Sequence, residues 1–231
     1  MINISGHNIS AVLFDLDNTL VDRDQAVERL GGQLFRGVEY DESGLYEPEW
    51  VQEFIRIDAG GSIADKREQM AMVIDELSII GEEPDRFVKW WDRAYPEAFT
   101  LEESTKHLLQ TLADTDTPWG IVTNGSLLQS FVIRAVGLDR LTKSIFVSSI
   151  IRLRKPDKAI FELAASSVSP GTELNNILFV GDNPIADIEG AAAAGMKTVW
   201  VSRGVDWWGK EQNPGDTIEN IWELSNLIES D

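Results

Sequence analysis

The sequence predicts an α/β fold: a parallel sheet covered by helices on both faces, with an all-helical segment inserted after the first strand. From residue 100 onward, short apolar runs alternate with helical stretches, which is typical of parallel strands joined by right-handed crossovers. Residues 22–99 have helical periodicity and almost no β-branched runs. We therefore expect a core formed by residues 1–21 and 100–231, interrupted by a helical insert at residues 22–99.

Composition narrows the possible partners. The chain has 231 residues with 20 basic and 39 acidic side chains, a net charge of −19, and no cysteine. Such a surface repels nucleic acid and anionic membranes, so we expect neither as a partner. No stretch resembles a signal peptide or a membrane span, and the lack of cysteine fits a reducing compartment. We expect a cytoplasmic protein, and the sequence leaves open whether it is a monomer or a homodimer.

The first strand organises the chain. The apolar run 11–14 has the character of a fully buried strand and ends abruptly in Asp15 and Asp17. The carboxyl ends of strands in an open parallel sheet are where ligands bind. A buried acid needs a partner or a metal. Asp15 and Asp17 are therefore candidate active-site residues.

The insert is expected to contain four helices, at residues 23–35, 47–57, 63–79 and 86–95. Gly60 and Gly61 interrupt the chain, and Ser62 is the expected N-cap of the third helix, with Asp65 in its first turn. Its length of roughly 70 residues suits a small domain.

The elements after the insert alternate in type. Thr100 and Glu103 form the pattern of a capping box for a helix that ends at Ala113. Further strands are expected at residues 119–123, 145–148, 177–180 and 197–201. Further helices are expected at residues 127–136 and 159–165, in a segment that ends at Gly195, and at 217–228. The tryptophans of the loop 207–215 are expected to cover the sheet edge.

Thr123-Asn124-Gly125 follows the second strand. A hydroxyl, a glycine turn and a helix N-terminus together make a suitable cradle for phosphate oxygens. The alternative is a simple strand-to-helix turn capped by Thr123.

Arg154-Lys155-Pro156-Asp157 follows the third strand. Pro156 keeps the preceding residue out of helical geometry, and we expect Lys155 to be exposed at the turn. A lysine there could hold a carboxylate and a phosphate together. The alternative is a solvated surface lysine.

Asp182 and Asp187 follow the fourth strand. A few close carboxylate oxygens favour Mg²⁺ over a softer metal. The alternative is an N-cap aspartate followed by an acid that interacts with the helix dipole.

The four patterns occur in one order, each at the end of its own strand. Asp15-Leu16-Asp17-Asn18-Thr19, then Thr-Asn-Gly, Lys-Pro-Asp and Gly-Asp followed by Asp187, resemble the four motifs of the haloacid dehalogenase superfamily. Most members of that superfamily are phosphatases. The resemblance implies a Rossmann-like three-layer core with a helical cap of type one.

The resemblance also implies roles for these residues. Asp15 is similar to the nucleophile that forms an aspartyl phosphate, and Asp17 to the general acid and base. The groups implied to stabilise the phosphoryl oxygens are Thr123, Lys155 and backbone amides near Leu16, Asp17, Asn124 and Gly125.

A Mg²⁺ site is implied as well. Its ligands would be the Asp15 and Asp182 side chains and the Asp17 carbonyl, with Asp187 in support. A carboxylate that attacks a phosphate dianion needs such cations to offset the repulsion. The implied partner is a small-molecule phosphate ester.

Asp17 bears on the reaction, because dehalogenases of the superfamily lack an acid at this position. Its presence favours phosphoryl chemistry. Ile150 and Arg152 depart from the family, which often has an acid and a glycine before the lysine motif. Phosphomutase or phosphonate chemistry, a non-enzymatic phosphoacceptor switch and a degenerate binding homologue remain alternatives. His7 and His107 match no motif and are expected at the surface.

Within the insert, Arg23, Lys66 and Arg67 are candidates for substrate contacts, and solvated helix faces are the alternative. Residues 22–100 carry 9 basic and 19 acidic side chains, a net charge of −10. We therefore expect the leaving group to be neutral or weakly charged, such as a sugar or an alcohol.

Overall fold

The protein forms two compact units. The computed structural model describes residues 2–39, 47–61, 65–211 and 215–229. The sheet unit comprises Met1–Val21 and Thr100–Asp231, and the helical unit comprises Asp22–Phe99. Among the described residues, none of the helices has the length and apolar character that a bilayer crossing requires. The two units are described separately below.

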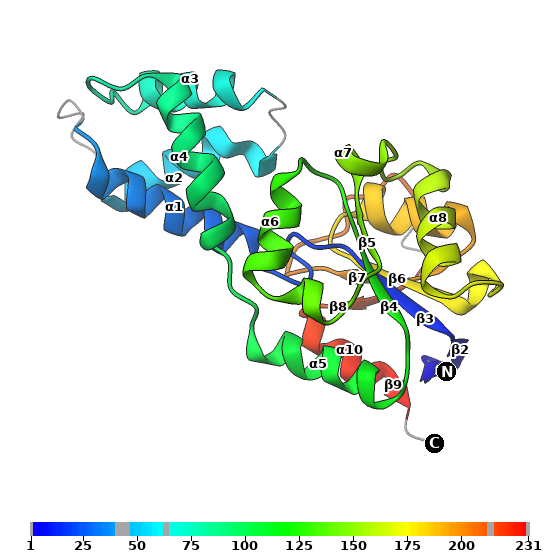
Figure 1. Ribbon diagram of the computed structural model, residues 1–231. Coiled ribbons are helices and arrows are strands. Elements are labelled where there is room, and N and C mark those ends of the chain that lie inside the picture. The colour runs from blue at the N-terminus through cyan, green and yellow to red at the C-terminus, as the bar shows by residue number, and fades with distance from the viewer. Residues whose placement is uncertain (1, 40–46, 62–64, 212–214, 230–231) are drawn as a thin grey trace. The chain divides into compact units, whose positions relative to one another are not determined.

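The sheet unit is built on six parallel strands in the order β5-β4-β3-β6-β7-β8 (Figure 1). The strands are β3 Ala11–Phe14, β4 Trp119–Thr123, β5 Ile145–Val147, β6 Ile177–Gly181, β7 Lys197–Val201 and β8 Asp216–Ile218. The central strand β3 is fully buried, as its continuous apolar run requires. The predicted α/β core is confirmed, with one strand more than expected.

Helices cover both faces of this sheet (Figure 1). The longer ones are α5 Glu103–Asp114, α6 Leu128–Ala135 and α8 Lys158–Val168, joined by the shorter α7 Ser148–Ile151, η2 Leu138–Arg140 and η3 Leu174–Asn176. After β6, the π-helix η4 Pro184–Glu189 continues directly into α9 Gly190–Ala194. Leu13, Phe179 and Phe161 belong to one apolar core on the α8 side of the sheet. The sheet positions the carboxyl ends of β3, β4 and β6 side by side.

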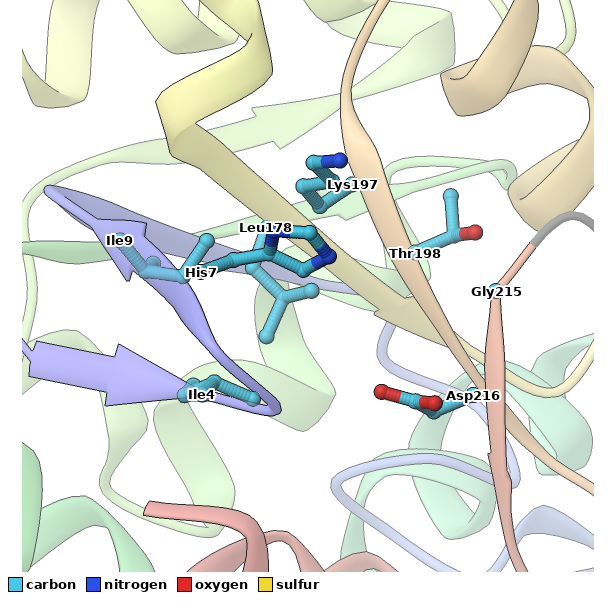
Figure 2. A pocket seen from close by; sticks show the side chains of 8 residues that line it. All are labelled: Ile4, His7, Ile9, Leu178, Lys197, Thr198, Gly215 and Asp216. Carbon is cyan, nitrogen blue, oxygen red and sulfur yellow. The ribbon is translucent and has the colours of Figure 1, made fainter. Parts of the chain in front are cut away.

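A second, antiparallel sheet was not predicted. It contains β1 Ile2–Ile4, β2 His7–Ile9 and β9 Ile228–Glu229 in the order β2-β1-β9. A pocket of about 260 Å³ lies beside it, lined by polar groups that include His7, Lys197 and Asp216 (Figure 2). Lys197 and Asp216 begin β7 and β8, so this pocket is at the amino edge of the large sheet. The motif residues lie at the opposite edge of the sheet, where the parallel strands have their carboxyl ends.

The predicted closing helix at residues 217–228 is wrong. Residues 216–218 form β8, which pairs with β7 so that Thr217 lies opposite Trp200. The segment then forms only η5 Ile221–Glu223 and α10 Leu224–Leu227 before β9. Asn220 and Glu223 make a capping box at the start of η5. The apolar spacing of this segment resembles a helix, but an open edge of the sheet offers its first residues backbone partners.

Two other local predictions need correction. The N-cap of helix α5 is Glu102, and its side chain makes no capping hydrogen bond. The predicted capping box, with Thr100 as the N-cap, is therefore not formed. In the loop after β7, Trp207 packs edge-on against Trp200 with ring centroids 5.0 Å apart. Trp208 is 52% exposed, so only Trp207 covers the sheet.

The helical unit contains α1 Arg23–Gly37, α2 Glu47–Asp58, η1 Ala59–Gly61, α3 Lys66–Glu76 and α4 Pro84–Glu97. Its core is aromatic: Trp50 stacks on Phe54, and Trp91 stacks on Tyr95 with centroids 4.9 Å apart. The third helix begins three residues later than predicted, because the Asp65 side chain accepts the backbone N–H groups of Arg67 and Glu68. The predicted N-cap Ser62 lies outside the described residues.

Candidate active site

Asp15 stands at the end of the central strand, and the loop after it is tightly folded. The Asp15 N–H donates to the carbonyl of Val180 on β6 at 2.9 Å. The carbonyl of Leu16 accepts the N–H groups of Leu20 and Val21 at 3.0 and 3.1 Å, and the Leu16 side chain is fully buried. These bonds fix Asp15 and Asp17 at the sheet edge. Both carboxylates are thus presented by a rigid element.

Lys155 is buried between two carboxylates, which corrects the prediction that it is exposed. Its side chain is only 2% exposed, and its Nζ lies 2.5 Å from Asp15 Oδ1 and 2.6 Å from Asp187 Oδ1. An ammonium can be buried when carboxylates compensate its charge. The neighbours that compensate it come from β3 and η4, so the local sequence around Pro156 did not reveal them.

Asn124 holds the backbone of Lys155 in place. Its Nδ2 donates to the Lys155 carbonyl at 2.9 Å, and its Oδ1 accepts the Lys155 N–H at the same distance. Both polar atoms of the Asn124 side chain are therefore engaged by the Lys155 backbone. This reciprocal pair ties the end of β4 to the loop that carries Lys155.

Asp187 approaches the end of β6 because Gly181 has no side chain. A Cβ at Gly181 would lie 2.6 Å from the Asp187 carboxyl carbon. The Asn183 N–H donates to Asp187 Oδ2 at 3.0 Å. Asp182, partly buried, follows Gly181, and the Nε1–H of Trp200 donates to its backbone carbonyl at 2.8 Å. Both acids are thus anchored to the sheet.

Three carboxylates converge at this edge. Asp15, Asp182 and Asp187 each offer an oxygen within 4.8 Å of the other two. Burial, the largest effect, raises the pKa of Asp15 to about 7, with Asp187 and Asp17 adding to it and Lys155 opposing it. Burial and the neighbouring Asp15 and Asp187 raise the pKa of Asp182 to about 8.

The same neighbours act on Lys155 in the opposite sense. Burial disfavours its charged form, but Asp15 and Asp187 outweigh that effect and raise the pKa of Lys155 above its usual value. Lys155 is therefore a permanent cation at neutral pH. Raised pKa values mean that Asp15 and Asp182 hold protons near neutral pH when no other cation is present. A bound metal ion would take the place of those protons and stabilise the ionised carboxylates.

The donor set fits Mg²⁺. Close carboxylate oxygens, in a chain that contains no cysteine, are the ligands of a hard divalent ion. The structure includes Asp187 in the carboxylate cluster, whereas the sequence assigned it only a supporting position. The prediction that the Asp17 backbone carbonyl is a ligand stays a prediction.

Two of the remaining predicted groups, Thr123 and Gly125, lie at or just after the end of β4. Thr123 is its last residue and is 1% exposed. The Gly125 N–H donates to Ser148 Oγ at 2.9 Å, so an anion would have to displace this hydroxyl to use that amide. The roles of Thr123, Gly125 and the amides near Leu16 stay predictions.

Sequence reasoning missed Gln129. This residue lies on α6 and is 6% exposed. Its Nε2 donates to Asp17 Oδ2 at 2.6 Å. A glutamine on an amphipathic helix carries no motif signal, and its partner is 112 residues away. Only the fold brings the two together.

The candidate residues of the helical unit differ in environment. Arg23 is buried and paired with Asp58 at 2.7 Å, so it is not on a solvated face. Lys66 lies over the Trp91 ring at 4.0 Å, and burial lowers its pKa to about 8. Arg67 is exposed and paired with Asp85 at 2.9 Å, which matches the solvated alternative. His7 and His107 are both exposed, as expected.

The fold and the cluster at the carboxyl edge define an α/β protein of the Rossmann-like class with an acid–lysine site. Residues 9–195 match the family model of haloacid dehalogenase-like hydrolases. The chain belongs to this family of hydrolases, as the four motifs indicated.

Relatives of known name agree with this assignment. The chain is 28% identical to the pyrimidine 5'-nucleotidase PynA of Streptococcus pneumoniae over 195 residues, and this aligned region covers 82% of each chain. It is 25% identical over 242 residues to the ribulose-1,5-bisphosphate 5-phosphatase of Halopiger xanaduensis, covering 95% of this chain and 99% of that one. The crystal structure of the HAD-hydrolase YfnB of Bacillus subtilis bound to magnesium has the same fold, with a TM-score of 0.77 and 24% identity, covering 96% of this chain and all of the other.

Proposed function

We propose that this protein is a Mg²⁺-dependent phosphatase that hydrolyses a small-molecule phosphomonoester through an aspartyl-phosphate intermediate. One observation carries the proposal: a buried carboxylate, Asp15, is held by a buried lysine at the end of the central strand, with a second acid, Asp17, two residues further on. A nucleophile, a cation for the phosphoryl oxygens and a proton donor are thus present together.

The reaction follows in two displacements. A carboxylate oxygen of Asp15 attacks phosphorus, the bond from phosphorus to the ester oxygen breaks, and Asp17 gives its proton to the departing alcohol. Water then attacks the same phosphorus while Asp17 takes up its proton. The bond between Asp15 and phosphorus breaks, and inorganic phosphate leaves with Asp15 restored.

Several groups of the chain offset the negative charge of this reaction. The Lys155 ammonium, 2.5 Å from Asp15 Oδ1, neutralises part of the charge on nucleophile and phosphoryl group, and Thr123 offers a hydroxyl. Asp15, Asp182 and Asp187 would hold the Mg²⁺ ion, together with the Asp17 carbonyl. The ion supplies positive charge that lets two anions approach each other.

The leaving group is proposed to be neutral or weakly charged. The helical unit, proposed as the cap that selects the leaving group, belongs to a segment of net charge −10, which disfavours a polyanion. The relatives do not decide this point, because one is named for a nucleotide and another for a bisphosphate. Comparing kcat/KM for sugar phosphates, small-acid phosphates, bisphosphates and nucleoside diphosphates tests it. A bisphosphate or nucleoside diphosphate as the best substrate would contradict the proposal.

The proposed chemistry is tested by hydrolysis of p-nitrophenyl phosphate with Mg²⁺, with EDTA, and with Asp15→Asn. We expect metal-dependent turnover that the substitution abolishes. Turnover that survives in Asp15→Asn, in a preparation free of other phosphatases, would show that the nucleophile is misassigned. A phosphoprotein that persists for hours after acetyl phosphate treatment would favour a phosphoacceptor switch instead.

A further inference from the structure

Gln129 makes a contact to the proposed acid, Asp17, that no motif accounts for. Its Nε2 donates to Asp17 Oδ2 at 2.6 Å, and the glutamine is 6% exposed. Its other amide atom, Oε1, is buried and accepts no hydrogen bond from the part of the chain that the structure describes. If this position served packing alone, an apolar side chain would fill it without leaving a buried acceptor unsatisfied. A glutamine at position 129 is therefore best explained by its hydrogen bond to Asp17.

The turn before α6 is shaped to admit this glutamine. A Cβ at Gly125 would lie 2.6 Å from Gln129 Cγ. Any larger residue at Gly125 would push the Gln129 side chain away from its place. The glycine of the Thr-Asn-Gly motif thus makes room for Gln129, in addition to forming the turn.

The chemistry of the bond distinguishes the two oxygens of Asp17. An amide N–H can only donate, so Oδ2 must keep a lone pair directed at Gln129. A carbonyl oxygen is a stronger acceptor than a hydroxyl oxygen, so when Asp17 carries its proton, this bond favours the proton on Oδ1. The bond also fixes the rotation of the carboxyl group about its long axis.

We propose that Gln129 is a positioning residue: it binds Asp17 through Oδ2 and so leaves Oδ1 to exchange the proton with the leaving group and with the hydrolytic water. This inference rests on the proposed function, in which Asp17 is the general acid and base. Gln129 itself does not touch the reacting atoms in this scheme.

The substitution Gln129→Met tests the inference, because methionine keeps the length of the side chain and cannot donate. A positioned acid matters most when the leaving group is a strong base and least when it leaves unassisted. We therefore expect kcat/KM to fall about twofold for p-nitrophenyl phosphate and more than about tenfold for an alkyl phosphate. In a series of aryl phosphates, the dependence of kcat/KM on leaving-group basicity should become steeper, approaching that of Asp17→Asn.

Gln110→Met is the matched control. Gln110 Nε2 donates to Asp114 Oδ1 at 2.7 Å on the exposed face of α5, so the same change removes a glutamine–aspartate bond outside the site. It should leave the slope unchanged. Thermal unfolding and calorimetric Mg²⁺ titration should give wild-type values for both variants. Gln129→Asn, whose side chain is one methylene shorter, serves as a second probe if Gln129→Met does not fold.

The outcomes separate the two proposals. If Gln129→Met lowers kcat/KM equally for all leaving groups, or does not lower it, the proposed role of Gln129 is overturned. The proposed function still stands in that case if turnover depends on Asp15 and Asp17→Asn gives the steeper slope. Wild-type protein without Asp15-dependent turnover of any ester would overturn the proposed function, and the inference with it.

Discussion

At the scale of single residues, the carboxylate cluster of Asp15, Asp182 and Asp187 could hold a cation. Burial raises the pKa of Asp15 to about 7 and that of Asp182 to about 8. Because the unfolded values lie near 4, the folded protein without metal binds more protons than the unfolded chain between about pH 4 and pH 8. Its stability therefore falls as the pH rises through this window.

Mg²⁺ binding should depend on pH for the same reason. The ion needs ionised ligands, so its binding displaces protons from Asp15 and Asp182 below about pH 8. We expect the apparent affinity to weaken at least tenfold from pH 8 to pH 6, and Mg²⁺ to raise the unfolding temperature more at pH 8 than at pH 6. Calorimetry in buffers of different ionisation enthalpy counts the released protons. Uptake of protons on binding, or release unchanged in Asp15→Asn, would contradict this assignment.

Gly181 is the residue on which the position of Asp187 depends. In Gly181→Ala, the new methyl group would meet the Asp187 carboxyl carbon at 2.6 Å, so the Asp187 carboxylate must shift and its contact with Lys155 is disturbed. We expect a loss of about 1–3 kcal/mol in the free energy of unfolding, as for other overpacked sites, together with loss of phosphatase activity.

Gly37→Ala is the control for this substitution, measured like it by urea unfolding. Gly37 is the exposed last residue of α1, and a Cβ there meets no atom within 4 Å. Alanine at this helical position should be neutral or stabilising by up to about 1 kcal/mol. If both variants unfold at the wild-type urea concentration, Asp187 is not constrained by Gly181.

At the scale of elements, the sequence predicts the five strands β3 to β7 well, but it misses the edge strand β8, the small antiparallel sheet and the contacts between elements. The strands 119–123 and 197–201 match their predictions residue for residue, because an apolar β-branched run bounded by turns has few other structures. Lys155 follows β5 only after the short helix α7, so it is not directly at the strand end as predicted. Its burial depends on Asp15 and Asp187, which are distant in sequence. Gln129 escaped notice for the same reason. Local pattern reveals an element, whereas contacts across elements require the fold.

The C-terminal segment shows the reverse problem. Ile218, Ile221 and Leu224 recur every three residues, the spacing of a helical face. The segment nevertheless supplies a strand, because β7 had an unpaired edge and Thr217 could pair with Trp200. Tertiary pairing decided the structure where helical propensity and strand propensity were both acceptable.

Within the helical unit, a buried ion pair joins α1 and α2. Arg23 begins α1 and pairs at 2.7 Å with Asp58, the last residue of α2, and Gln69 on α3 donates to the same carboxylate at 3.2 Å. Breaking a buried pair strands a charge, so we expect Asp58→Leu to lower the free energy of unfolding by about 3 kcal/mol or more.

The double substitution Arg23→Met with Asp58→Leu should restore much of that loss, since it removes both charges of the pair. Urea unfolding of the two single variants and the double variant measures the coupling. The exposed pair Arg67–Asp85 provides the control, and its removal should cost less than about 1 kcal/mol. A double variant as unstable as the sum of the singles would show that the two charges are not coupled.

At the scale of the whole molecule, the net charge of −19 opposes compactness. Described ion pairs such as Arg56–Glu53 and Lys158–Glu162 satisfy some acids, but acids outnumber bases almost two to one. Self-repulsion of this kind acts over the Debye length, which is about 30 Å at 0.01 M salt and about 3 Å at 1 M. Salt should therefore relieve it.

We expect the unfolding temperature of the protein in EDTA to rise by about 3 °C or more between 0.01 M and 0.5 M NaCl, a gain of about 1 kcal/mol. EDTA removes divalent ions, so the rise cannot come from a divalent ion bound at the carboxylate cluster. KCl should give the same rise as NaCl, because screening depends on ionic strength and not on the identity of the cation. A difference between the two salts would indicate a specific monovalent site. An unfolding temperature that stays flat or falls would mean that the surface ion pairs, which salt weakens, outweigh the repulsion.

The local attraction between Lys155 and Asp15 should persist across the salt series, because a pair 2.5 Å apart and shielded from solvent is little screened.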